Sequence, residues 1–193
     1  MIVIIAGKAG SGKSTLRKGL LREFPSFSKS ISYTTRPPRE GEVNGVDYRF
    51  VSQENFLKNP GIFLKREENG NFYGVHKDSF CGQNVLSILD LNGINEITHF
   101  LPQEDIRLIY LAVPHSVLID RLTQRGTPQP IIFKRLVRDQ NINQHNLETN
   151  FPHLPLLVLE NTSLEDSLRK SVQFIKQTSL QRIYTFQKPD LQR

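Results

Sequence analysis

A phosphate-binding pattern lies close to the start of the chain. Residues 7–14 read Gly-Lys-Ala-Gly-Ser-Gly-Lys-Ser, which is the G-x-x-x-x-G-K-S spacing of a P-loop. Its glycines allow backbone conformations that turn successive N–H groups inward around a phosphate chain. Lys13 adds a positive charge for the β- and γ-phosphates, and Ser14 offers a hydroxyl to Mg²⁺. The pattern therefore predicts a site for a nucleoside triphosphate with Mg²⁺.

The residues on either side of this pattern support the same interpretation. Residues 2–5 are apolar and β-branched, which indicates a buried strand, and residues 16–24 continue as an amphipathic helix that begins near Lys13. The positive end of that helix would point at the phosphates. A glycine-rich turn without a ligand is the alternative, but the strand, the helix and the complete Gly-Lys-Ser ending favour the P-loop. The residues expected at the nucleotide are Gly7, Lys8, Ala9, Gly10, Ser11, Gly12, Lys13, Ser14 and Thr15.

Strand-like and helix-like segments alternate along most of the chain. After the first strand and helix, strands are expected at residues 27–33, 84–90, 106–113 and 156–159, and helices at 115–124, from about 131, and at 164–175. Residues 34–77 form a long insert in which 47–51 and 62–66 resemble short strands and 70–71 a turn. The alternation predicts an α/β fold of the P-loop NTPase type with a doubly wound parallel sheet.

The expected organisation is a single domain over residues 1–177. A chain of 193 residues with 37% hydrophobic content can bury one core of this kind. That core would comprise residues 1–33, 78–124 and 146–177, interrupted by the insert at 34–77 and a short lid at 125–145. Residues 178–193 would follow as a C-terminal tail with weak periodicity.

Asp90 is a second candidate partner for Mg²⁺. It ends the apolar segment at residues 84–89, and the carboxyl ends of parallel strands meet at the edge of the sheet where the P-loop begins. An acid at this position typically contacts the metal through water. A helix-capping or turn aspartate is the alternative. The sequence thus predicts Ser14 and Asp90 as the metal-binding residues.

Composition narrows the possible partners. The formal net charge of +6 suggests an anionic partner, but basic runs of five or more are absent and several arginines lie inside motifs, so nucleotide phosphates are favoured over nucleic acid. The single cysteine, Cys81, cannot form an internal disulfide, which favours a reducing compartment such as the cytoplasm. The sequence has no apolar run of membrane length, and its histidines lack metal-ligand spacing. We expect a monomer or homodimer.

The insert carries a long motif. Residues 32–52 read Ser-Tyr-Thr-Thr-Arg-Pro-Pro-Arg-Glu-Gly-Glu-Val-Asn-Gly-Val-Asp-Tyr-Arg-Phe-Val-Ser, and residues 71–74 read Asn-Phe-Tyr-Gly. This stretch closely resembles the nucleotide-binding region of guanylate kinases. Segments 89–90, 121–127, 134–136 and 160–161 follow in the family's order, so the resemblance extends to about residue 176. It implies ATP-dependent transfer of the γ-phosphoryl group to GMP, with Mg²⁺.

The resemblance also implies roles for individual residues. Ser32, Arg36, Arg39, Tyr48 and Tyr73 would hold the acceptor's phosphate, with Glu42 bracing the arginines; Arg121, Arg125 and Arg135 would reach the transferring phosphoryl group from the lid; and Asn161 would lie near the adenine. With Lys13, the arginines at 36, 121, 125 and 135 form the expected catalytic set. Guanidinium groups suit this chemistry, because they bind phosphate bidentately and offset the repulsion between two anions. A solvated surface charge is the alternative for any single arginine, and simple packing for the two tyrosines.

The base-reading positions depart from the family's pattern. The family reads guanine with a glutamate, a serine or threonine, and an aspartate, whereas the nearest positions here hold Lys65, Val75 and Asn92. Glu67 lies on the same strand face as Lys65 and could substitute for the glutamate. A valine cannot hydrogen-bond the base, and loss of such a contact lowers selectivity strongly. The sequence therefore predicts an intact phosphate site, with Asp90 nearby, beside an altered guanine pocket.

Two other functions remain open at this stage. The segments 69–75 and 91–93 are similar to those of ribose 1,5-bisphosphate kinases, so a related small-molecule kinase with a non-guanine acceptor is the first alternative. A non-catalytic guanylate-kinase-like binding module is the second. Such modules typically have a degraded P-loop, and the intact motif here disfavours that interpretation.

Overall fold

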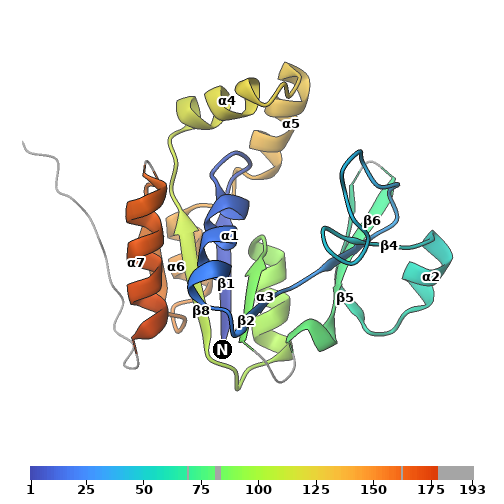
Figure 1. Cartoon of the computed structure of the whole chain (residues 1–193), viewed down its shortest axis with the longest axis horizontal. Coiled ribbons are helices and arrows are strands. Elements are labelled where there is room, and N and C mark those ends of the chain that lie inside the picture. The colour runs from blue at the N-terminus through green and yellow to red at the C-terminus, as the bar shows by residue number, and fades with distance from the viewer. Residues whose placement is uncertain (69, 81–83, 162, 178–193) are drawn as a thin grey trace, which may run out of the picture.

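Five parallel strands form the central sheet of the computed structural model, which describes residues 1–68, 70–80, 84–161 and 163–177. The strands are β1 (Ile2–Gly7), β2 (Phe27–Lys29), β7 (Asn84–Ile88), β8 (Ile106–Leu111) and β9 (Leu156–Leu159), in the spatial order β2-β7-β1-β8-β9. The first strand is central and the chain winds outward to both sides of it (Figure 1). The predicted doubly wound α/β fold is confirmed.

The two faces of this sheet bury alternate residues of β1. Ile2 and Ile4 pack in one cluster, which α3 (Leu91–Phe100) and α6 (Gln144–Asn150) complete. Val3 and Ile5 face the other cluster, which α1 (Lys13–Glu23) and α7 (Leu164–Lys176) complete. Because successive side chains of a strand point to opposite faces, one apolar run supplies both layers.

The insert forms a second, smaller sheet beside the first. Its strands are β3 (Ser32–Thr34), β4 (Arg49–Phe50), β5 (Ile62–Glu68) and β6 (Asn71–His76), in the order β4-β3-β6-β5. Helix α2 (Gln53–Lys58) and the short 3-10 helix η1 (Lys77–Phe80) complete it. In Figure 1 this unit stands to the right of the main sheet, while α4 (His115–Gln124) and α5 (Gln129–Arg138) lie above the P-loop.

Several predicted element boundaries were wrong. The single strand expected at 27–33 is two strands in different sheets, because the chain leaves the main sheet after Lys29. The hydroxyls of Ser30 and Ser87 form a hydrogen bond of 2.8 Å at this point. The strand expected at 47–51 is only Arg49–Phe50. Helix α5 begins at Gln129 rather than near 131, since Pro130 fits a first helical turn, where its missing N–H is not needed.

Three short helices were not predicted. They are α2, α3 and α6, and each begins at a residue whose side chain accepts a backbone N–H of the first turn: Ser52, Asp90 and Asn143. The predicted roles of Cys81 and of residues 178–193 lie outside the described residues. Among the described residues, none of the helices is long and apolar enough to cross a membrane.

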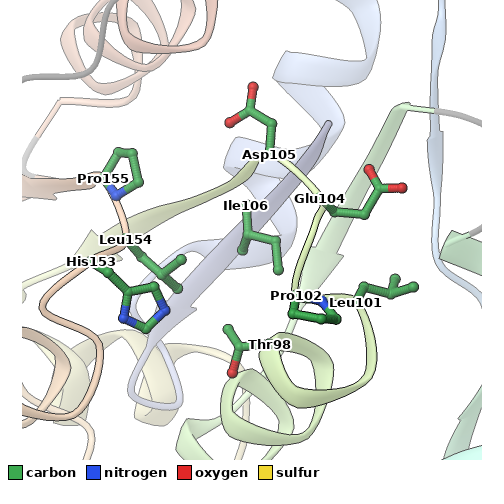
Figure 2. A pocket seen from close by; sticks show the side chains of 9 residues that line it. All are labelled: Thr98, Leu101, Pro102, Glu104, Asp105, Ile106, His153, Leu154 and Pro155. Carbon is green, nitrogen blue, oxygen red and sulfur yellow. The ribbon is translucent and has the colours of Figure 1, made fainter.

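A pocket opens at the end of the sheet opposite the P-loop. Figure 2 shows it between the end of α3, the start of β8 and residues 153–155. Glu104 and Asp105 place carboxylates in its wall. Carboxylates would repel a phosphate, so this pocket suits a nucleotide less well than the carboxyl ends of the strands do.

Candidate active site

The P-loop forms a tight turn between β1 and α1. The N–H of Ser11 donates to the carbonyl of Lys8 at 3.1 Å, and Gly10 and Gly12 adopt φ angles of 83° and 96°, which favour glycine. A Cβ on Gly12 would lie 2.5 Å from the side-chain nitrogen of Asn161, so the turn also needs the missing side chain for close packing. Gly12 is the N-cap of α1, which leaves the amides of the first turn facing the loop.

Lys13 lies in the floor of a cavity at the carboxyl ends of β1 and β7. Its ammonium donates to the carbonyls of Gly7 at 2.6 Å and Lys8 at 2.8 Å. Burial is the main cause that lowers the pKa of Lys13 to about 8, and the nearby Asp139 carboxylate opposes that shift. The cavity wall also contains Arg66, Asp90, Arg138 and Asp139. Charged groups of both signs therefore converge on the place where a phosphate chain would lie.

Asp90 lies just beyond β7 and caps α3. One carboxylate oxygen accepts the N–H of Gly93 at 2.9 Å, so Asp90 is a helix-capping residue, as the alternative interpretation expected. Its other oxygen is 3.4 Å from the guanidinium of Arg66 and faces the cavity of Lys13. Ser14 is exposed in the first turn of α1. The metal-binding role of Ser14 and Asp90 stays a prediction.

The arginine motif of the insert forms a braced cation. Arg36 is buried, and its guanidinium donates to both carboxylate oxygens of Glu42 at 2.7 and 2.6 Å. Glu42 also accepts the backbone N–H of Arg39 at 2.8 Å. The Arg36 guanidinium lies 5.0 Å from the ring centre of Tyr48, whose ring meets that of Tyr73 at 6.2 Å. The structure thus brings Arg36, Glu42, Tyr48 and Tyr73 together, and their contact with an acceptor phosphate stays a prediction.

This ion pair predicts a specific dependence of stability on pH. The hydrogen bonds from Arg36 are the main cause that lowers the pKa of Glu42 from 4.5 to about 2. A carboxyl group with a lowered folded-state pKa stabilises the protein above its unfolded-state pKa, and this contribution is lost as pH falls from about 4.5 to about 2. We expect urea midpoints of Glu42→Gln to change less between pH 6 and pH 3 than those of the unmodified chain. Glu54→Gln, which removes an exposed pair with Lys58, should leave the difference unchanged.

A second pocket lies between the insert hairpin and α3. Its wall includes Ser32, Lys65, Tyr73, Val75, Asn92 and Glu96. A register shift between Phe63 and Arg66 interrupts the pairing of β5 with β6, and Leu64 within it has a φ of 54°, a strained value for leucine. The N–H of Leu64 donates to the carboxylate of Glu96 at 2.9 Å. Glu96 and Asp90 are therefore the carboxylates in the wall, whereas Glu67, which follows the shift and pairs with Phe72, stays a prediction.

A family model described as guanylate kinase matches residues 1–178 of the chain. The chain belongs to the guanylate kinase family. The guanylate kinase of Nitratidesulfovibrio vulgaris is 38% identical over 136 residues, covering 66% of this chain and 65% of that protein. That of Streptomyces coelicolor is 34% identical over 178 residues, covering 88% and 87%. A crystal structure of guanylate kinase from Anaplasma phagocytophilum shares the fold, with a TM-score of 0.63, 22% identity and coverage of 91% of this chain and 84% of that one.

Two of the arginines that the guanylate kinase resemblance assigns to catalysis lie behind the P-loop. Arg121 donates to the carbonyls of Asn161 at 3.0 Å and Ser11 at 3.5 Å. Arg125 and Asn161 line a groove with Gly12. Gly10 and Thr15 also line this groove, and the adenine contact expected of Asn161 stays a prediction. Asn161 itself contacts the carbonyl of Ser11 through its side-chain nitrogen.

Helix α5 of this guanylate kinase contributes charged residues that the sequence reasoning missed. Arg135 lies one turn before Arg138, and it is Arg138 whose guanidinium enters the wall of the P-loop cavity. Arg138 donates to Asp139 at 2.7 Å and to Glu68 on β5 at 2.9 Å. Asp139 in turn accepts the N–H of Ala9 at 2.7 Å. The basic run of α5 was the available signal, but the sequence could not show which of its arginines turns toward the P-loop.

Proposed function

We propose that this chain transfers the γ-phosphoryl group of ATP to GMP, which yields ADP and GDP. One observation carries this proposal: the P-loop cavity and the pocket of the insert adjoin, and they share the walls formed by Arg66, Asp90 and Asn92. A phosphate chain held at Lys13 and an acceptor held in the pocket of the insert would therefore meet at the shared wall. This arrangement supports transfer between two bound nucleotides.

The reaction needs positioning and charge neutralisation rather than a side-chain nucleophile. An oxygen of the GMP phosphate attacks the γ-phosphorus of ATP, and the bond from that phosphorus to the β–γ bridging oxygen breaks. Lys13 and the P-loop amides would hold the leaving side, and the braced guanidinium of Arg36 the acceptor side. Arg121, Arg125 and Arg135 belong to the proposed lid at 125–145 and its approach, where closure would exclude water.

Mg²⁺ is the proposed metal partner of ATP. The hydroxyl of Ser14 and the Asp90 oxygen that lies 3.4 Å from Arg66 are hard oxygen donors, which suits Mg²⁺. The metal would neutralise charge on the phosphates.

Because ATP and a nucleoside monophosphate are the proposed substrates, we place the activity in the cytoplasm and in purine nucleotide metabolism. We propose no nucleic-acid partner, and a monomer or homodimer with one catalytic domain over residues 1–177.

Glu96 supports guanine as the base, although Lys65, Val75 and Asn92 depart from the family's pattern. Guanine presents two N–H donors side by side, at N1 and at the 2-amino group, together with the acceptor O6. A carboxylate can accept both donors, and an ammonium can donate to O6. Glu96 and Lys65 line the same pocket and provide these groups, and both are exposed to it. Adenine, with an acceptor at N1, would face the carboxylate unfavourably.

A conservative variant of Glu96 tests this assignment. Glu96→Gln retains an oxygen that can accept the N–H of Leu64, but it loses one acceptor for guanine. We expect kcat/KM for GMP to fall about 30-fold and that for IMP, which lacks the 2-amino group, to fall much less. Steady-state kinetics with both acceptors measure this, with Asp120→Asn on exposed α4 as the control. Equal losses for GMP and IMP would mean that Glu96 acts only through Leu64.

The decisive experiment is a coupled assay with Mg·ATP and a panel of acceptors. The panel contains GMP, dGMP, IMP, AMP and ribose 1,5-bisphosphate. Turnover confined to the guanine nucleotides, with weaker use of IMP, is the expected result. Turnover of ribose 1,5-bisphosphate alone would replace the proposal with the first alternative, and binding without turnover of any acceptor would favour a binding module.

A further inference from the structure

Asp139 holds a position that a nucleotide would need. Its carboxylate accepts the N–H of Ala9 at 2.7 Å, and this amide belongs to the loop that wraps the phosphates. The side chain is buried, with 5% of its surface exposed. It also lines the cavity of Lys13. A carboxylate oxygen therefore accepts a hydrogen bond from an amide that could instead donate to a phosphate oxygen.

The local fold does not favour an acid at this point. Asp139 is the C-cap of α5, where the carbonyl end of the helix carries partial negative charge. A carboxylate there is repelled by the helix to which it belongs. Its stabilising partners come instead from the P-loop amide and from Arg138, which donates to the second oxygen at 2.7 Å. The contacts, rather than the helix, explain why a negative side chain is buried here.

These contacts continue into the acceptor side. Arg138 bridges Asp139 to Glu68, which lies near the end of β5 in the insert hairpin, at 2.9 Å. A continuous chain of charged groups thus joins the P-loop, the end of α5 and the hairpin. If the carboxylate of Asp139 moves, Arg138 loses one of its two anchors.

The geometry points to Asp139 as an internal substitute for phosphate. A bound nucleotide must displace the Asp139 carboxylate from the Ala9 amide, and this displacement loosens the contact between α5 and the insert hairpin. Two anions cannot share the Ala9 amide, and the low exposure of the site strengthens their repulsion. The free protein would therefore bind nucleotide more weakly than its P-loop alone allows. Once freed, Arg138 is available to the incoming phosphates. The inference rests on nucleotide binding at the P-loop and is independent of which acceptor is used.

Titration of ADP without acceptor tests the first part, by calorimetry with Asp139→Ala, Asp139→Asn and the control Asp120→Asn. We expect Asp139→Ala to bind ADP about tenfold more tightly, because the amide is free and the negative charge is gone. Asp139→Asn removes the charge but keeps an acceptor, so its affinity should fall between the two. Unchanged or weaker ADP binding by both variants would overturn the inference. If Asp139→Ala does not melt cooperatively, the affinity of Asp139→Asn alone is compared with that of the unmodified chain by the same criterion.

Hydrogen exchange of the β5 amides tests the coupling. ADP should increase exchange at residues 62–68 in the unmodified chain, whereas in Asp139→Ala exchange should already be high and insensitive to ADP. If ADP leaves the amide exchange rates of β5 unchanged in the unmodified chain, the coupling is refuted. Absence of any ADP binding would instead contradict the proposed kinase function, so the two failures are distinguishable.

Discussion

Lys13→Ala is expected to lower kcat for GMP phosphorylation about 10³-fold, a loss comparable to that caused by removing one preorganised charge from a transferring phosphoryl group. The ammonium donates to the carbonyls of Gly7 and Lys8, inside the cavity that Asp90 and Arg138 also line. No other lysine among the described residues of that wall could replace it. A coupled assay at saturating Mg·ATP and GMP measures the loss.

Lys18→Ala is the matched control, since Lys18 is exposed on the same helix α1. It should retain the kcat of the unmodified chain. Should Lys13→Ala keep most of its activity while remaining folded, the P-loop would not be the site of phosphoryl transfer, and the assignment of the whole cavity would fail.

Arg36→Ala is expected to lower kcat/KM for GMP about 10²- to 10³-fold, mainly through a higher KM. The guanidinium is planar, buried and aligned by the two hydrogen bonds that it donates to a single carboxylate, so a phosphate would meet it without reordering. Arg36→Lys should rescue only part of the loss, because an ammonium cannot bind Glu42 and a phosphate in the same forked geometry. Arg49→Ala, in the same small sheet with its guanidinium 5.7 Å from the ring of Tyr33, is the control.

A second variant separates lost phosphate binding from the charge left behind. Removing Arg36 leaves Glu42 without its main partner beside the acceptor site, and that carboxylate would itself repel a phosphate. The double variant Arg36→Ala with Glu42→Gln removes both charges. Recovery of activity in the double variant would show that Arg36 acts only to neutralise Glu42, whereas continued loss supports direct contact with the acceptor.

The elements predicted best are those with a strong local pattern. The helix expected at 115–124 and the strand expected at 156–159 match α4 and β9 residue for residue, and the P-loop has its expected strand and helix. Helices α2 and α6 were missed because they have only 6 and 7 residues. Helix α3 has 10 residues, as many as α4, and was missed because Asp90, expected as the end of a strand, is the side-chain cap with which this helix begins.

The missed site residues depend on contacts between distant parts of the chain. Glu67 was chosen because strand residues two apart share a face, but the register shift between Phe63 and Arg66 breaks that rule beside Lys65. Glu96 enters the same pocket from α3, and Asp139 reaches Ala9 across 130 residues of sequence. The sequence holds no local signal for either approach, so only the folded arrangement could reveal them.

The points where the insert joins the main sheet have a wider consequence. Strands β2 and β7, which precede and follow the insert in the chain, are paired directly, with Phe27 opposite Asn84. Because the pair is parallel, the insert leaves at the C-terminal end of β2 and returns at the N-terminal end of β7, and the sheet that carries the P-loop contributes no strand to the smaller sheet. Substitutions within the insert, such as those at Lys65 and Val75, can therefore change its pocket without repacking the main sheet, whereas Asn92 belongs to α3, which packs on that sheet. A scaffold built in this way is suited to acquiring new acceptors by exchange of a module.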